Sequence, residues 1–120
     1  MLAIRKLSPV IGAEISGANL ISPSHEEFKE REQALSEHSV LFFRDQPKLS
    51  PKQQVAFAAQ FGPLHSHPAA PTLEEDEAIF VIKTVANSKI ANGNGWHTDV
   101  SYGSEPTIVT SHPISKRRAL

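Results

Sequence analysis

The chain has 120 residues, enough for one domain of ordinary size, and a formal net charge of −1 from 12 basic and 13 acidic residues. Charges so evenly balanced create no strong field, which argues against nucleic acid or a membrane surface as a partner. The sequence contains no cysteine, which excludes disulfides, thiolate metal sites and cysteine nucleophiles. Residues 1–6 carry no apolar run of the length of a signal peptide or a membrane span, so we expect a soluble, cytoplasmic protein.

Runs of strand-like composition recur along the chain, at residues 2–7, 13–20, 39–43, 78–82 and 107–110. The runs at 39–43 and 78–82 are uncharged and rich in β-branched or aromatic residues, so we expect buried strands there. Prolines and a block of acidic residues between 68 and 77 predict an exposed loop.

Two helices are predicted from capping boxes, in which a hydroxyl and an acidic or amide side chain stand three residues apart. Ser24 and Glu27 begin the first helix, which continues to about Glu37. Ser50 and Gln53 begin the second, with a proline at its first helical position and Gly-Pro at its end. The spacing of three and four residues predicts inward-facing side chains at Phe28, Arg31, Leu35, Val55, Ala58, Ala59 and Phe61.

This order of elements predicts an α+β fold with a mainly antiparallel sheet and two helices near the start of the chain. A sheet that closes into a jelly roll normally needs about eight strands. The sequence supplies five or six, so the chain is short for a closed architecture.

A histidine and an aspartate, His97 and Asp99, follow a glycine-rich loop. If the segment is extended, alternate side chains share a face, and the two backbones lie about 6.6 Å apart. The imidazole and the carboxylate can then bind the same cation. Ser101 shares their face of the strand, and the opposite face carries Trp96, Thr98 and Val100. Two histidines and one carboxylate suit non-haem Fe(II), so this pair offers two of three ligands. Chance alone supplies about 0.15 such pairs, so the bare motif also fits an incidental surface ion pair.

A second alternating pair, His65 and His67, stands before the proline-rich segment. Spacing alone leaves open a small cupin-like metal protein with the ligands His65, His67, His97 and Asp99. The remaining early histidines, His25 and His38, are expected at the surface or in packing contacts.

Five segments occur together in the order of one known family, at residues 11–20, 40–46, 49–54, 61–68 and 96–102. The last two read Phe-Gly-Pro-Leu-His-Ser-His-Pro and Trp-His-Thr-Asp-Val-Ser-Tyr. Together they resemble the TauD/TfdA-like, or taurine dioxygenase, family of Fe(II)- and 2-oxoglutarate-dependent dioxygenases. The resemblance implies a double-stranded β-helix, a cupin-like jelly roll that is incomplete in this chain. It also implies decarboxylation of 2-oxoglutarate to succinate, coupled to hydroxylation of a substrate.

Residue roles follow from the same resemblance. His97 and Asp99 match the first two iron ligands, and His67 matches a contact to the sulfonate of the substrate. Further substrate contacts fall at Val100, Tyr102, Asn92 and Asn94. A tyrosine of taurine-specific members is missing, since Ala70 stands near its place. The resemblance therefore implies a small anionic substrate, either another sulfonate, a sulfate ester or an unrelated anion.

The end of the chain departs from the family pattern. Residues 1–106 resemble the N-terminal part of the domain, whereas residues 107–120 resemble a much later segment. An internal deletion between Pro106 and Thr107, with truncation after Leu120, is the simplest account. The distal iron-binding His and the Arg and Thr that bind 2-oxoglutarate are then missing. His112 belongs to the later segment and is not expected to replace that ligand.

Three readings of the function remain. The first is a 2-oxoglutarate-dependent dioxygenase for a sulfonate-like substrate, of which this chain is a fragment with little turnover. The second is the cupin-like metal protein. The third is a non-catalytic fragment that forms homo-oligomers, or associates with full-length homologues, through unpaired strand edges.

Overall fold

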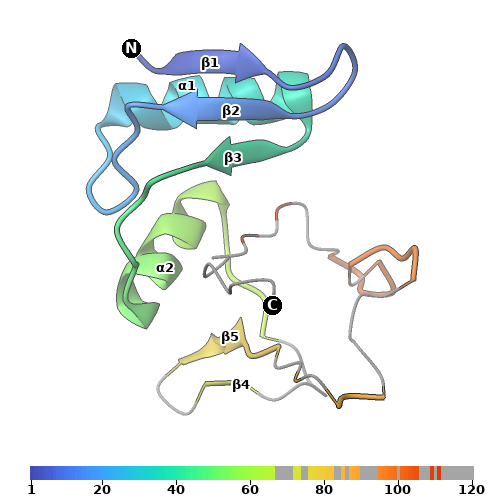
Figure 1. Ribbon diagram of the computed structural model, residues 1–120. Coiled ribbons are helices and arrows are strands. Elements are labelled where there is room, and N and C mark those ends of the chain that lie inside the picture. The colour runs from blue at the N-terminus through green and yellow to red at the C-terminus, as the bar shows by residue number, and fades with distance from the viewer. Residues whose placement is uncertain are drawn as a thin grey trace. The chain divides into compact units, whose positions relative to one another are not determined.

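The computed structural model describes residues 1–66, 72–73, 76–82, 85, 87–89, 95–99, 101–105, 109 and 111. The chain divides into two compact units, 1–61 and 62–120, and each is described by itself. The first unit contains the strands β1 to β3 and both helices, and the second contains the strands β4 and β5 (Figure 1).

The first unit is built on a three-stranded sheet of order β1-β2-β3. Strands β1 (Ala3–Lys6) and β2 (Ala13–Ser16) are antiparallel, whereas β2 and β3 (Leu41–Phe43) are parallel. The prediction of a strand over 13–20 is wrong in its length. Gly17 has φ +77°, a left-handed conformation that ends the extended run.

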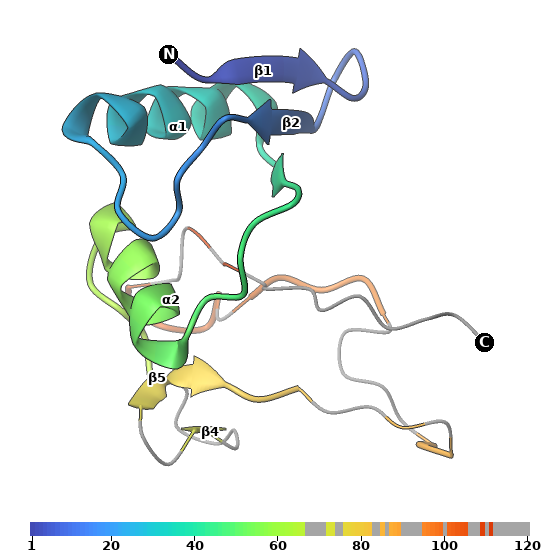
Figure 2. The ribbon, with the colours of Figure 1, turned by 60° about the vertical axis from the view of Figure 1, so that its left-hand side comes forward.

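Helix α1 (His25–His38) connects the two parallel strands and runs across one face of the sheet (Figure 2). Its predicted capping box is confirmed. The Glu27 amide donates to Ser24 Oγ at 3.2 Å, and the Ser24 amide donates to the Glu27 carboxylate at 2.8 Å. Between the helix and the sheet, the small core of this unit consists of Leu2, Ile15 and Ala34, with Ala18, Leu41 and Phe43 packed against them.

The second helix, α2 (Pro51–Ala58), begins with the same device at Ser50 and continues into a 3-10 turn, Ala59–Phe61. The expected inner stripe is wrong in one respect, because Ala59 is exposed while Phe57 is buried. Four rings from α1, β3, α2 and the 3-10 turn contact one another edge to face, with centroids 5.3 to 6.4 Å apart: Phe28, Phe43, Phe57 and Phe61. This aromatic cluster selects the buried face of α2.

Strand β3 differs from its expected burial. Val40, directly before it, and Phe42 in its centre are exposed by 39% and 42%, so the prediction of a buried strand is wrong. Only the face toward α1 is covered, and in the described part of the chain β3 pairs with β2 alone. One edge of β3 and one edge of β1 are therefore unpaired among the described residues.

The other face of the sheet carries an ion-pair network around Glu14. Its carboxylate accepts a hydrogen bond from Arg44 and another from Arg5, the latter at 3.0 Å. Arg44 first, and then Arg5, hold the pKa of Glu14 below its ordinary value of 4.5.

In the second unit, β4 (Thr72–Leu73) and β5 (Asp76–Phe80) form an antiparallel pair. The expected loop over 68–77 is thus wrong at Thr72, Leu73, Asp76 and Glu77. The strand predicted at 78–82 begins earlier and ends at Phe80, and its described side chains are half-buried or exposed rather than buried. Of the strand expected at 107–110, only Val109 is described, and it lies outside any strand.

The described elements bear out a partial sheet with two N-terminal helices, and the closed β-helix stays a prediction. No helix among the described residues has the length and apolar character needed to cross a membrane.

Candidate metal centre

The segment that carries His97 is irregular rather than a strand. Its described residues have bends at Gly95 and Asp99 and a turn at 101–102. The hydroxyls of Thr98 and Ser101 lie 2.7 Å apart, within hydrogen-bond distance, although strict strand alternation would place them on opposite faces. Among the described residues, bends, this hydroxyl contact and the turn at 101–102 stand where a strand was expected.

The two predicted ligands nevertheless converge. His97 Nε2 lies 3.2 Å from Asp99 Oδ1. The side chains are 54% and 46% exposed, so the pair is open to solvent and contributes little to stability as an ion pair.

The other nitrogen of the His97 ring is bound to the backbone. Nδ1 lies 2.7 Å from the carbonyl oxygen of Gly95. A carbonyl oxygen only accepts, so Nδ1 must carry the proton of this hydrogen bond. In neutral imidazole the lone pair then lies on Nε2, the atom that faces Asp99.

This arrangement suits a cation between the two side chains. A carboxylate oxygen and an unprotonated imidazole nitrogen are both acceptors and cannot hydrogen-bond to each other. Two ligands at right angles, each about 2.1 Å from one ion, lie about 3 Å apart. The 3.2 Å between Nε2 and Oδ1 is close to that separation, so His97 and Asp99 fit as neighbouring ligands of one metal ion.

The third ligand is not found in the described part of the chain, where no three His, Cys, Asp or Glu side chains gather to hold a metal. His65 is described and exposed, and it does not join His97 and Asp99 in such a group. The remaining members of the predicted site, His67, Val100, Asn92 and Asn94, lie outside the described residues.

Two aromatic side chains flank the candidate centre in sequence. Trp96 is fully exposed, and Tyr102, expected in the substrate pocket, is 73% exposed in the turn after Asp99. The Gly95 carbonyl was missed by sequence reasoning, because a backbone acceptor leaves no side-chain signal. The Thr98–Ser101 pair was also missed, although hydroxyl residues three apart are a turn signal.

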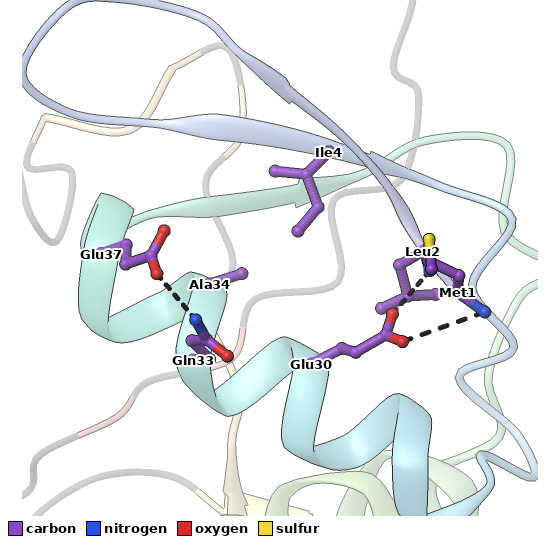
Figure 3. A pocket seen from close by; sticks show the side chains of 7 residues that line it. All are labelled: Met1, Leu2, Ile4, Glu30, Gln33, Ala34 and Glu37. Atoms are coloured by element: carbon purple, nitrogen blue, oxygen red, sulfur yellow. Dashed lines mark hydrogen bonds and ion pairs between the residues drawn. The ribbon is translucent and has the colours of Figure 1, made fainter.

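A separate pocket of about 180 Å³ lies between β1 and α1 in the first unit (Figure 3). Glu30 closes one side, where its carboxylate accepts from the Leu2 amide at 2.6 Å and lies 3.9 Å from the Met1 ammonium. On the other side the Gln33 amide donates to Glu37 at 3.0 Å. The Glu30 contacts attach the two residues before β1 to the helix, whereas the Gln33–Glu37 bond lies within α1. The pocket includes none of the predicted site residues.

Known proteins are similar to this chain in sequence, and solved structures are similar to it in fold. The chain is 41% identical over 102 residues to an alkylsulfatase of Acinetobacter baylyi, covering 84% of this chain and 31% of that protein. It is 31% identical to an alpha-ketoglutarate-dependent sulfate ester dioxygenase of Pseudomonas putida, covering 84% and 33%. The crystal structure of a taurine dioxygenase from Burkholderia xenovorans matches with a TM-score of 0.71 and 32% identity, over 88% of this chain and 37% of that one.

The chain thus spans about a third of the length of these curated relatives. The family match covers most of the chain, residues 3–111, and is to the taurine catabolism dioxygenase TauD, TfdA family. With this match, the likeness to the solved taurine dioxygenase and the His97–Asp99 pair, the chain belongs to the TauD/TfdA family of dioxygenases.

Proposed function

We propose that the protein is an Fe(II)- and 2-oxoglutarate-dependent dioxygenase for a small sulfonate or sulfate ester, with His97 and Asp99 as two of its three iron ligands. The observation that carries the proposal is the 3.2 Å separation of Nε2 and Oδ1, which suits neighbouring ligands of one ion. Membership of the family supports the reaction class.

When bound, Fe(II) and 2-oxoglutarate would supply the electrons that activate O2, of which one atom hydroxylates the substrate and the other enters succinate. The chain's own residues bind and orient. His97 presents a neutral nitrogen donor, and the Asp99 carboxylate offsets part of the charge of the cation. His67 donates to the anionic group of the substrate, and Tyr102 and Val100 line its pocket. Asn92 and Asn94 contact its polar end.

The anionic group of the substrate is proposed from the relatives. Two of them are named as an alkylsulfatase and as a sulfate ester dioxygenase. Taurine itself is disfavoured, because the tyrosine of taurine-specific members is missing near Ala70. A sulfate ester or another sulfonate therefore fits better than taurine.

The complete site needs more than these 120 residues. We propose that residues 1–106 form the N-terminal part of the dioxygenase domain and that residues 107–120 are a later segment, joined after a deletion. The third iron ligand and the arginine that clamps 2-oxoglutarate then lie outside the chain. Two ligands hold iron poorly, so the chain alone has little or no turnover, and substrate-dependent succinate formation by the purified chain would refute this.

The metal role is tested by titrating the full chain with Mn²⁺ and following the loss of free-ion EPR signal. The expected result is weak binding that disappears in His97→Ala and in Asp99→Ala. His65→Ala is the matched control and retains binding, as does His67→Ala. Loss of binding in either control would favour the cupin-like four-ligand site instead. Equal binding by His97→Ala and the unchanged chain would defeat the proposal.

A non-catalytic role is favoured by one further observation. The edge of β3 that is unpaired among the described residues and the exposed side chains of Val40 and Phe42 form a surface that another copy, or a full-length homologue, can extend by strand pairing. This association is compatible with an inactive chain.

A further inference from the structure

We infer that the Gly95 carbonyl is a positioning group, which holds His97 in the Nδ1–H tautomer and so reserves Nε2 for the metal. The inference rests on the proposed role of His97 as an iron ligand. It assigns a function to a backbone atom that no side-chain motif marks.

The first support is the contact itself. At 2.7 Å the separation of Nδ1 and the Gly95 oxygen is short for an N–H···O hydrogen bond. The 3.2 Å from Nε2 to Asp99 Oδ1 is longer. Since the proton of neutral imidazole occupies one nitrogen only, the shorter contact favours Nδ1.

The second support is the local geometry of the chain. Nδ1 is the ring nitrogen nearer the backbone, and Gly95 is only two residues before His97. Its carbonyl therefore lies beside Nδ1, whereas Nε2 faces Asp99. A hydrogen bond on one imidazole nitrogen commonly fixes the tautomer and the orientation of a metal-binding histidine.

The third support is that the segment has an internal hydrogen-bond contact on each side of the His97–Asp99 pair. The Gly95 contact precedes His97, and the Thr98–Ser101 hydroxyl contact spans Asp99. Both ligands thus lie on a short stretch with two internal bonds, which limits their rotation before any ion binds.

The proposed positioning group is the backbone carbonyl of residue 95, so a side chain at this position should not affect it. A Cβ built at Gly95 meets no atom of the described residues within 4 Å. Gly95→Ala keeps the carbonyl and is therefore the matched control, expected to leave both tautomer and metal affinity unchanged.

The tautomer can be read in the full, metal-free chain from imidazole ¹⁵N shifts and couplings of ¹⁵N-histidine-labelled protein, above the titration range of histidine. His97 is expected in the Nδ1–H form in the unchanged chain, in Gly95→Ala and in Asp99→Ala, where the competing acceptor is gone. His25, an exposed reference, is expected in the ordinary Nε2–H form. A predominant Nε2–H form of His97 in any of the three proteins would overturn the inference.

Weakening the carbonyl provides a second measurement. Replacing Trp96 by its α-hydroxy analogue converts the Gly95 amide into an ester, whose carbonyl is a poorer acceptor. The Nδ1–H fraction is expected to fall and the Mn²⁺ affinity to drop about 10-fold, at the low end of the cost of losing such a partner. The same exchange at Tyr102 is the control. An unchanged tautomer in the Trp96 ester would overturn the inference, whereas an Nδ1–H chain that binds no Mn²⁺ would support it and defeat only the proposed metal role.

Discussion

The guanidinium carbon of Arg31 lies 5.7 Å from the centre of the Phe57 ring, so a cation is packed into the aromatic cluster of the first unit. Arg31 has no exposed area. Its Nε donates to the Glu27 carbonyl at 3.1 Å, but its two terminal nitrogens have no acceptor among the described residues. Burial lowers the pKa of Arg31 below its ordinary value, because the charged form is desolvated.

Replacing this arginine by methionine is expected to stabilise the chain. A buried charge without acceptors costs several kcal/mol, whereas methionine keeps the contact with Phe57. Arg31→Met should raise the free energy of unfolding in urea by about 1–3 kcal/mol. Lys29→Met, at an exposed position of α1, is the control and should change it by less than about 0.5 kcal/mol. A lower urea midpoint for Arg31→Met would show that the guanidinium is satisfied.

The Glu14 network predicts a specific loss of stability in acid. The pKa of Glu14 is lower in the folded chain than its ordinary value of 4.5. The carboxylate therefore contributes its full stabilisation of the fold above pH 4.5, and this stabilisation is lost as the pH falls through the pKa of the folded chain. Glu14→Gln should therefore unfold at a lower temperature near neutral pH, and this difference should shrink in acid. Thermal scans across the range would measure it.

Two partner variants sharpen that test. Arg44→Ala should reduce the acid dependence more than Arg5→Ala, because Arg44 is the larger cause of the lowered pKa. Parallel pH profiles for the unchanged chain and Glu14→Gln would contradict the assignment.

The capping boxes predict equal losses at two distant positions. Ser24 Oγ and Ser50 Oγ each accept from the third helical amide at 3.2 Å. Ser24→Ala and Ser50→Ala should each lower the free energy of unfolding by about 1 kcal/mol, since an amide at each helix start loses its partner. Ser36→Ala, at an exposed site inside α1, should have almost no effect. Similar losses at all three serines would rule out capping as the cause.

The edge of β3 that lacks a partner strand in the described part of the chain predicts concentration-dependent association. Phe42→Lys places a charge at its centre and should shift the chain toward monomer, as measured by light scattering after gel filtration. Ile21→Lys, in a loop with a similar exposure of 43%, is the control. A mass distribution that Phe42→Lys leaves unchanged would exclude this edge as the contact surface.

Some of this fold could be predicted because its signals are local. Ser24 and Ser50 predict helix starts through capping partners three residues later, and the structure confirms both. Burial depends on partners far along the chain. Phe57, rather than Ala59, faces inward because it meets Phe43 of β3, which no periodicity within α2 reveals. Strand pairing at Thr72, Leu73, Asp76 and Glu77 was missed, since this proline-flanked acidic stretch has low strand preference and backbone pairing overrides it.

The two heads of the candidate centre meet as expected, but on a different backbone, and their role stays a prediction. Alternation suggested that His97 and Asp99 could meet, and their heads do lie 3.2 Å apart. The extended strand behind that expectation is absent from the described part of the segment, where the hydroxyls of Thr98 and Ser101 lie within hydrogen-bond distance. Which other side chains complete the centre stays a prediction, because His67 lies outside the described residues.

The crossover from β2 through α1 to β3 has a consequence for the order of folding. All strands of the three-stranded sheet, and the helix that covers it, lie before residue 44. Loop closure over so short a stretch carries a modest entropic cost. During synthesis from the N-terminus, all residues of this sheet are therefore made before His97, and the segment proposed to bind a metal follows later.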